Sequence, residues 1–140
     1  MSQENVKFLR EGFRAVASGD SDSWQVLSRS RISPNFEFRS VLLGQVFSGP
    51  RWAEEFQEEI RQAFDDFSLE VEEIVDLGEH VVVVVRVSGR GAGSGVPTAQ
   101  QRGFVWTFDG TTAIAATQYP SKADALAAVG VESRRGDSNP

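Results

Sequence analysis

Apolar residues recur at helical spacing in the first third of the chain and again after residue 50. This period predicts a first helix that starts at Ser2 and ends at Gly19, a shorter helix that begins at Asp20, and a third helix that opens at Pro50. Glycine after the first pattern and proline at the start of the third are typical of helix boundaries. The apolar positions of these helices are Val6, Leu9, Phe13, Val16, Trp24, Leu27, Trp52, Phe56, Ile60 and Phe64.

Strand-like alternation occupies the rest of the chain. Residues 34–39 place Phe36 and Phe38 on one side, which predicts a short strand with one buried face. A second alternating segment begins at Phe67 and slips after Val71, which predicts a β-bulge.

Three further strands are predicted toward the end of the chain. Residues 81–87 are apolar at nearly every position, as expected of a strand covered on both faces. After a glycine-rich connection, residues 98–108 and 111–119 flank the hairpin signal Asp109-Gly110. The four consecutive strands therefore predict an antiparallel meander.

The closing segment predicts a capped helix followed by a tail. Ser121 is a suitable N-cap, and Gly130 ends the apolar pattern. We expect residues 1–131 to form a single domain and residues 132–140 to be disordered. The order of elements predicts an α+β fold in which helices pack on one face of a curved, mostly antiparallel sheet.

Composition narrows the functional classes. The chain has 140 residues, no cysteine, one histidine and a net charge of −6, so we expect no disulfide, thiolate nucleophile or metal site. No basic stripe indicates nucleic-acid binding, and no apolar run is long enough to span a membrane. The glycine-rich segment 89–95 leads into a strand rather than a helix, so it does not indicate a phosphate-binding loop or a cofactor. Without a signal-peptide pattern at the amino terminus, we expect a cytoplasmic location.

Five short segments resemble one protein family in their order and spacing. They are FRAVASGD from residue 13, PNFEF from residue 34, DLGEHV from residue 76, FVWTFDG from residue 104 and YPSKADAL from residue 119. Over residues 3–131 the chain resembles the SnoaL-like branch of the nuclear transport factor 2-like superfamily. The resemblance implies a cone-shaped α+β barrel whose sheet wraps around the N-terminal helices, a cavity at its open end, and a homodimer.

Some members of this family are steroid isomerases, and their catalytic residues provide a comparison. The isomerases resemble this chain around its first helix and first strand, where they use a tyrosine and an aspartate. Aligning the Gly-Asp turn places Gly12 at the tyrosine and Phe38 at the aspartate. Since Tyr119 is the only tyrosine, the usual oxyanion-binding arrangement is absent.

Other members are polyketide cyclases or epoxide hydrolases. The cyclases use a histidine and an aspartate near the last two strands. Here the single histidine, His80, lies beside a turn, and Phe104 is the residue on the corresponding strand. Ser121 occupies the position where the cyclases frequently have aspartate. The hydrolases pair an arginine with two carboxylates, and Arg86 followed by Ser88 does not reproduce that set. Each of these activities would therefore need a nonstandard site.

Charged residues within the strands are the remaining candidates for catalysis. Glu37 could act as a general base with Arg86 or Arg102 if its strand face looked into an apolar cavity; the alternative is that it faces solvent. Arg86 interrupts the valine run and could orient an acidic ligand group or lie at a dimer interface. Arg102 shares its face with three aromatic residues and could be a polar anchor in a pocket, although such aromatics also form plain cores.

These patterns leave three hypotheses open. The first is a binding site for a small hydrophobic molecule; the second is an isomerase, cyclase or hydrolase with Glu37 and Arg86 as catalytic residues; the third is a structural homodimer whose cavity is filled by aromatic side chains. The predicted ligand-binding residues are Phe13, Trp24, Phe38, Trp52, Arg102, Phe104, Trp106 and Tyr119.

Overall fold

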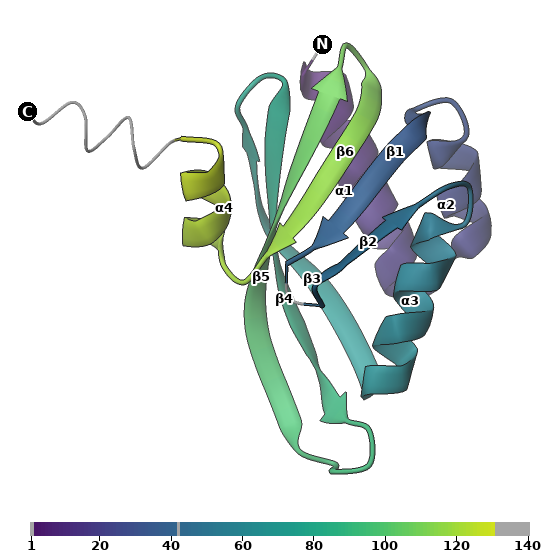
Figure 1. The fold of residues 1–140 in the computed structure, drawn as a ribbon, viewed down its shortest axis with the longest axis vertical. Helices are drawn as coiled ribbons and strands as arrows, with labels where there is room; N and C mark the ends of the chain where they lie inside the picture. Colours follow the sequence, from purple (N-terminus) through teal and green to yellow (C-terminus); the bar gives the residue numbers. More distant parts are fainter. Residues whose placement is uncertain (1, 42, 131–140) are drawn as a thin grey trace, which may run out of the picture.

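The computed structural model describes residues 2–41 and 43–130 (Figure 1). The helices are α1 (Ser2–Ser18), α2 (Ser21–Ser28), α3 (Trp52–Ala63) and α4 (Lys122–Ala128). The strands are β1 (Ile32–Ser40), β2 (Gln45–Ser48), β3 (Phe64–Asp76), β4 (His80–Gly91), β5 (Pro97–Asp109) and β6 (Thr112–Tyr119). The tail predicted for residues 132–140 lies outside the described residues.

One mixed sheet organises the molecule. Its strand order is β2-β1-β6-β5-β4-β3, and β3 to β6 form the predicted antiparallel meander. β1 runs parallel to β6 and antiparallel to β2. The sheet curves around α1, while α4 lies on its other side (Figure 1). This arrangement confirms the predicted α+β cone, which is open rather than closed because β2 and β3 form free edges.

β4 lies between β3 and β5 and is covered on both faces, as its valine run predicts. Val81, Val83 and Val85 are buried in the main core together with residues of α1, β1 and β5. Val82 and Val84 point the other way and pack in a smaller cluster beneath α4. We call the side of the sheet that faces α1 the inner face and the side beneath α4 the outer face.

Local capping explains where the short helices begin. The side chain of Asp20 accepts hydrogen bonds from the Ser23 backbone N (3.0 Å) and Oγ (2.6 Å), and these bonds lower the pKa of the Asp20 carboxyl. The side chain of Ser121 accepts a bond from the backbone N of Asp124 at 3.2 Å, which confirms the predicted N-cap of α4. α1 ends as predicted at Gly19, whose φ of 76° favours glycine.

Several elements differ from the sequence-based prediction. β2 was not predicted, because only four residues pair with β1 and this is too short for a visible alternation. α3 begins at Trp52 rather than Pro50, and Phe64 is already extended (φ −138°, ψ 143°) because it pairs with Gly91. Through this pairing β4 extends to Gly91, into the glycine-rich segment 89–95 that was predicted to be a loop.

The bulge predicted in β3 is present, and a second irregularity lies nearer its start. The β3–β4 register shifts between Val71 and Glu73, as expected, and also between Asp65 and Ser68. Asp66 within this second shift has a φ of 55°, a left-handed conformation that Asp tolerates better than most residues. The backbone is therefore irregular where β3 passes the end of α3.

Gly103 on the outer face of β5 provides a stability prediction. A Cβ atom there would lie 2.6 Å from the Ser121 carbonyl oxygen and 2.9 Å from the Cβ of Ala125, so α4 would have to move. We expect Gly103→Val to lower the free energy of unfolding by about 2–3 kcal/mol, measured by urea denaturation. Ala99→Val, at an exposed position of the same strand, is the control. Equal stability of the two variants would contradict the close packing of α4.

Candidate functional site

A cavity of about 590 Å³ lies between the helices and the inner face of the sheet. Its wall comes from α1, α2 and α3 on one side and from β1, β3, β4, β5 and β6 on the other. Most of the residues in the wall are apolar. The volume is within the range of small-molecule sites, which is roughly 300–1,000 Å³.

Aromatic rings form a large part of the cavity wall. The Trp52 ring centre lies 6.0 Å from that of Trp24, 5.6 Å from Phe38 and 6.2 Å from Trp106. The Phe38 ring in turn stacks on Phe104 at 6.1 Å. Such flat, rigid walls favour ligands with planar apolar bodies.

Gly12 allows α1 and α2 to approach closely at this wall. A Cβ atom on Gly12 would lie 2.9 Å from Cζ3 of Trp24, so a larger residue would displace the indole. Gly12 and Phe38 both line the cavity. The two positions that align with the tyrosine and aspartate of the isomerases thus lie in the wall, and neither carries a titratable group.

A short hydrogen-bond chain fixes the orientation of Gln118 in the wall. Gln118 is 7% exposed, and its Oε1 accepts a hydrogen bond from Ser40 Oγ at 2.7 Å. Ser40 Oγ in turn accepts a bond from the backbone N of Leu43 at 3.1 Å. The bond to Oε1 orients the amide, and the Gln118 Nε2 group is a donor without a partner among the described residues.

Arg102 brings a positive charge to the same part of the wall. Its Nη1 donates to the carbonyl oxygens of Gln101 (2.8 Å) and Pro120 (3.4 Å), and its Nη2 donates to Oε1 of Gln100. Burial lowers the pKa of the guanidinium from its ordinary value. No acidic side chain of residues 2–41 or 43–130 forms an ion pair with it.

The other two charged residues in the wall already have partners. Arg61 Nη2 lies 2.6 Å from Oε1 of Glu58, and Asp66 pairs with Arg90. Asp66 is the only carboxylate among the described residues of the wall, and its side chain is 72% exposed. The cavity interior is therefore apolar with donor groups, and its acid lies at the rim.

Most of the predicted ligand-binding residues lie together in this cavity. Seven of the eight are in its wall, on α1, α2, β1, α3 and β5. They are Phe13, Trp24, Phe38, Trp52, Arg102, Phe104 and Trp106.

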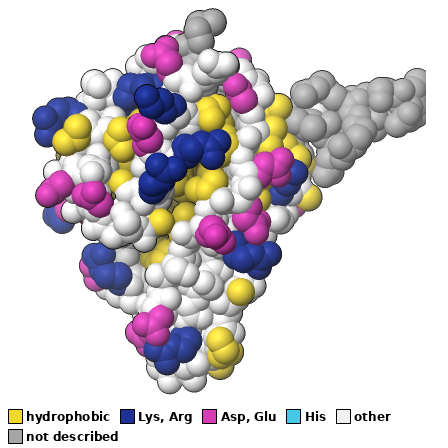
Figure 2. Space-filling view, turned by 180° about the vertical axis from the view of Figure 1, so that it is seen from behind, with side chains coloured by type: hydrophobic (Ala, Val, Ile, Leu, Met, Phe, Trp, Pro, Cys, Tyr) yellow, Lys and Arg dark blue, Asp and Glu magenta, His cyan; other side chains and the backbone are white. Residues whose placement is uncertain are grey.

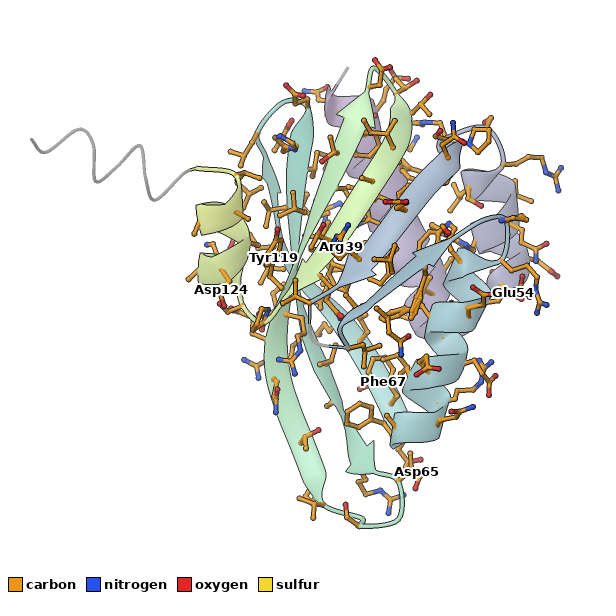
Figure 3. All side chains as sticks on the ribbon, in the orientation of Figure 1. Arg39, Glu54, Asp65, Phe67, Tyr119 and Asp124 are labelled. Carbon is orange, nitrogen blue, oxygen red and sulfur yellow. The ribbon has the colours of Figure 1, made fainter. Side chains whose placement is uncertain are left out.

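The remaining predicted site residues lie elsewhere. Tyr119 packs in the outer cluster beneath α4 (Figure 3). Successive side chains of a strand point to opposite faces, and its neighbour Gln118 lines the cavity. Glu37 is exposed between the buried Phe36 and Phe38 and is not in the cavity wall. The side chain of Arg86 is half exposed, and its Nε lies 3.1 Å from Oε2 of Glu72 on the outer face. The structure therefore does not bring Glu37 and Arg86 together at the cavity.

Sequence reasoning missed Gln118 as a cavity residue. The residues of β6 alternate, so that Ala116 and Gln118 are buried while Thr117 and Tyr119 are only partly buried. A polar residue in line with the buried positions of β6 could have indicated a polar group in the cavity wall. The β5–β6 register shifts between Thr107 and Phe108, however, so the parity of β6 could not be transferred from its partner strand.

Within residues 2–41 and 43–130, no group of three or more His, Asp or Glu side chains is placed to hold a metal ion. None of the described helices is both long and apolar enough to cross a membrane.

Comparison with known structures places the fold. A SnoaL-like polyketide cyclase, named as putative, from Jannaschia sp. CCS1 is 22% identical, covers 92% of this chain and 91% of its own, and has a TM-score of 0.69. TerC, co-crystallised with polyporic acid, is 15% identical and has a TM-score of 0.69. The match covers 86% of this chain and 94% of TerC. The third structure is a protein with a ketosteroid isomerase-like fold from Catenulispora acidiphila, in complex with trimethylamine. It is 13% identical and has a TM-score of 0.67, and the match covers 89% of this chain and 92% of that protein.

Sequence comparison identifies the family. No curated protein matches the chain. The sequence profile of the SnoaL-like domain matches residues 9–118, which is more than half of the chain and includes the helices and strands that enclose the cavity. The chain therefore belongs to the SnoaL-like domain family and has its nuclear transport factor 2-like fold.

Proposed function

We propose that this protein binds a small, largely apolar molecule in its aromatic cavity. The observation that carries the proposal is the cavity itself, which has a volume of about 590 Å³ and a wall built from Trp24, Trp52, Trp106 and several phenylalanine side chains. Enclosing a ligand of this kind removes apolar surface from water, at roughly 25 cal/mol for each Å². Polar groups in the wall would orient the ligand.

Two alternatives from the sequence have less support. A homodimer whose cavity is filled by its own side chains does not fit a void of this volume. Catalysis by Glu37 with Arg86 or Arg102 requires an inward carboxylate, but Glu37 is exposed on β1. Because Asp66 at the rim is the only carboxylate in the described wall and is paired with Arg90, the cavity is better suited to binding than to proton transfer.

Similar structures give further support for a small-molecule site. TerC was co-crystallised with polyporic acid, and the protein from Catenulispora acidiphila was determined with trimethylamine. Those ligands belong to those proteins. We propose by analogy that the cavity of this fold is also the binding site here.

We also propose that two copies associate through the outer face of β1, β2 and β6, away from Tyr119, where α4 packs on the end of β6. Val46 (46% exposed) and Ile114 (40% exposed) are apolar residues on these strands, and Arg39 lies opposite Val46 in the β1–β2 ladder. A second copy would remove this apolar surface from water. The cytoplasmic location inferred from the sequence stays a prediction.

Native mass spectrometry of the freshly purified protein tests both parts of the proposal. We expect a dimer mass, and a retained small molecule whose loss restores the mass of the protein alone. The absence of any adduct, even after incubation with hydrophobic ketones and polycyclic acids, would contradict ligand binding. A monomer mass at all concentrations would contradict the proposed interface.

A further inference from the structure

Unpaired donor groups gather at one end of the cavity. In the β5–β6 ladder Phe104 lies opposite Gln118, and Arg102 lies two residues from Phe104 on the same face of β5. Successive residues on one strand face are about 6.6 Å apart, so Arg102 and Gln118 flank the Phe104 ring. We call this region, made of Arg102, Phe104 and Gln118, the polar end of the cavity.

Gln118 offers an unpaired donor to a ligand. Its Oε1 is bound to Ser40, and its Nε2 has no partner among the described residues. Trp106 Nε1 is also a donor, and it is the one buried side-chain nitrogen or oxygen of the described residues that lacks a partner. Since the described wall residues leave side-chain donors unpaired and no buried side-chain acceptor unpaired, the wall is complementary to a ligand that supplies acceptors.

Arg102 specifies the charge of that acceptor. A guanidinium has five N–H groups, and three of those of Arg102 have acceptors, which leaves one on Nε and one on Nη2. Arg61 and Asp66 in the same wall are already neutralised by Glu58 and Arg90. Arg102 is therefore the charged residue of the described wall that forms no ion pair.

These observations deepen the proposed function and rest on it. We infer that the ligand is a planar aromatic or polycyclic carboxylate. Its ring system lies in the cavity against the wall that Phe38, Trp52 and Phe104 form, and its carboxylate accepts hydrogen bonds from Arg102 and Gln118. Two N–H groups on one guanidinium match the two oxygens of a carboxylate, which gives strong and directional binding.

Equilibrium binding of two matched probes tests the inference. The probes are 2-naphthoate and its neutral methyl ester, which have the same ring system. We expect the wild-type protein to bind 2-naphthoate at least about 10-fold more tightly than the ester. Arg102→Gln should weaken binding of 2-naphthoate by about 10- to 100-fold and binding of the ester by less than about 3-fold.

Two further variants make the test specific. Arg102→Lys keeps the charge without the fork of donors and should restore part of the preference for 2-naphthoate. Arg10→Gln removes an exposed arginine of α1 outside the cavity wall and should leave both affinities unchanged. Thermal unfolding followed by circular dichroism verifies that each variant is folded.

The possible failures are distinguishable. Equal binding of 2-naphthoate and its ester by the wild-type protein would overturn the carboxylate inference and leave the apolar cavity site intact. The carboxylate inference also fails if Arg102→Gln and Arg102→Lys are both folded and both retain the full preference. Binding of neither probe would count against the cavity site and against the inference with it.

Discussion

Replacing Phe38 by alanine should lower the free energy of unfolding by about 3–5 kcal/mol. The Phe38 side chain is 1% exposed, and its ring centre lies 4.7 Å from that of Phe56, 5.6 Å from Trp52 and 6.1 Å from Phe104. Alanine removes contacts with β5 and α3 at once, and the rigid rings around it cannot close the space. Chemical denaturation with urea or guanidinium measures the loss.

A milder substitution separates packing from the mere presence of a large residue. Phe38→Leu keeps most of the apolar volume and should cost less than half as much as Phe38→Ala. Because Phe38 also lies in the cavity wall, both variants should bind a ring-shaped ligand more weakly. A cost below about 1 kcal/mol for Phe38→Ala would show that the ring does not join the sheet to α3.

Filling the cavity should have the largest effect on binding. Ala53 on α3 is partly buried, packs against the aromatic core and lies in the cavity wall. A tryptophan at this position would occupy the space available to a ligand, so we expect Ala53→Trp to weaken binding of 2-naphthoate by at least about 100-fold. Fluorescence titration or calorimetry measures the affinity.

The control for this variant lies on the same helix. Ala63→Trp introduces the same side chain at an exposed position outside the cavity wall, and it should change the affinity less than about 2-fold. Unchanged binding by Ala53→Trp, with its fold verified by circular dichroism, would place the ligand outside the cavity. An equal loss in both variants would point to a nonspecific effect of the added ring.

The main elements were predictable because strong local patterns determine them. The valine run of β4 identified the strand that is covered on both faces, and Phe104 and Trp106 alternate with residues of the outer face. Helical spacing brought Phe13 and Trp52 to the inner side. For these residues local periodicity and tertiary burial agree, so their place in the cavity wall could be inferred.

Other features depend on contacts that no local pattern records. Gln118 was missed and Tyr119 was assigned to the pocket, because the register shift in the β5–β6 hairpin decides which residue of β6 faces inward. The face of Glu37 was left open by the sequence, and it is exposed because Phe36 and Phe38 fill the core. The pairing of Gln118 with Ser40 joins residues 78 positions apart.

The sequence could not show which charged residues lie in the cavity, because charged residues occur on both faces of the sheet. The face opposite to that of Figure 1 shows apolar side chains between Lys and Arg side chains near its middle (Figure 2). Strand arginines occur on both sides of the sheet, with Arg86 paired outside and Arg102 in the cavity wall. Both have the residue type expected of an anion anchor, and only the fold shows that Arg102 lacks a carboxylate partner among the described residues.

A crystal structure of the protein with bound 2-naphthoate tests the central claim most directly. The account predicts density for the ring system inside the cavity, against the wall formed by Phe38, Trp52 and Phe104, with the carboxylate at the polar end. A cavity closed by its own side chains, or a ligand bound only on the outer face of the sheet, would contradict it.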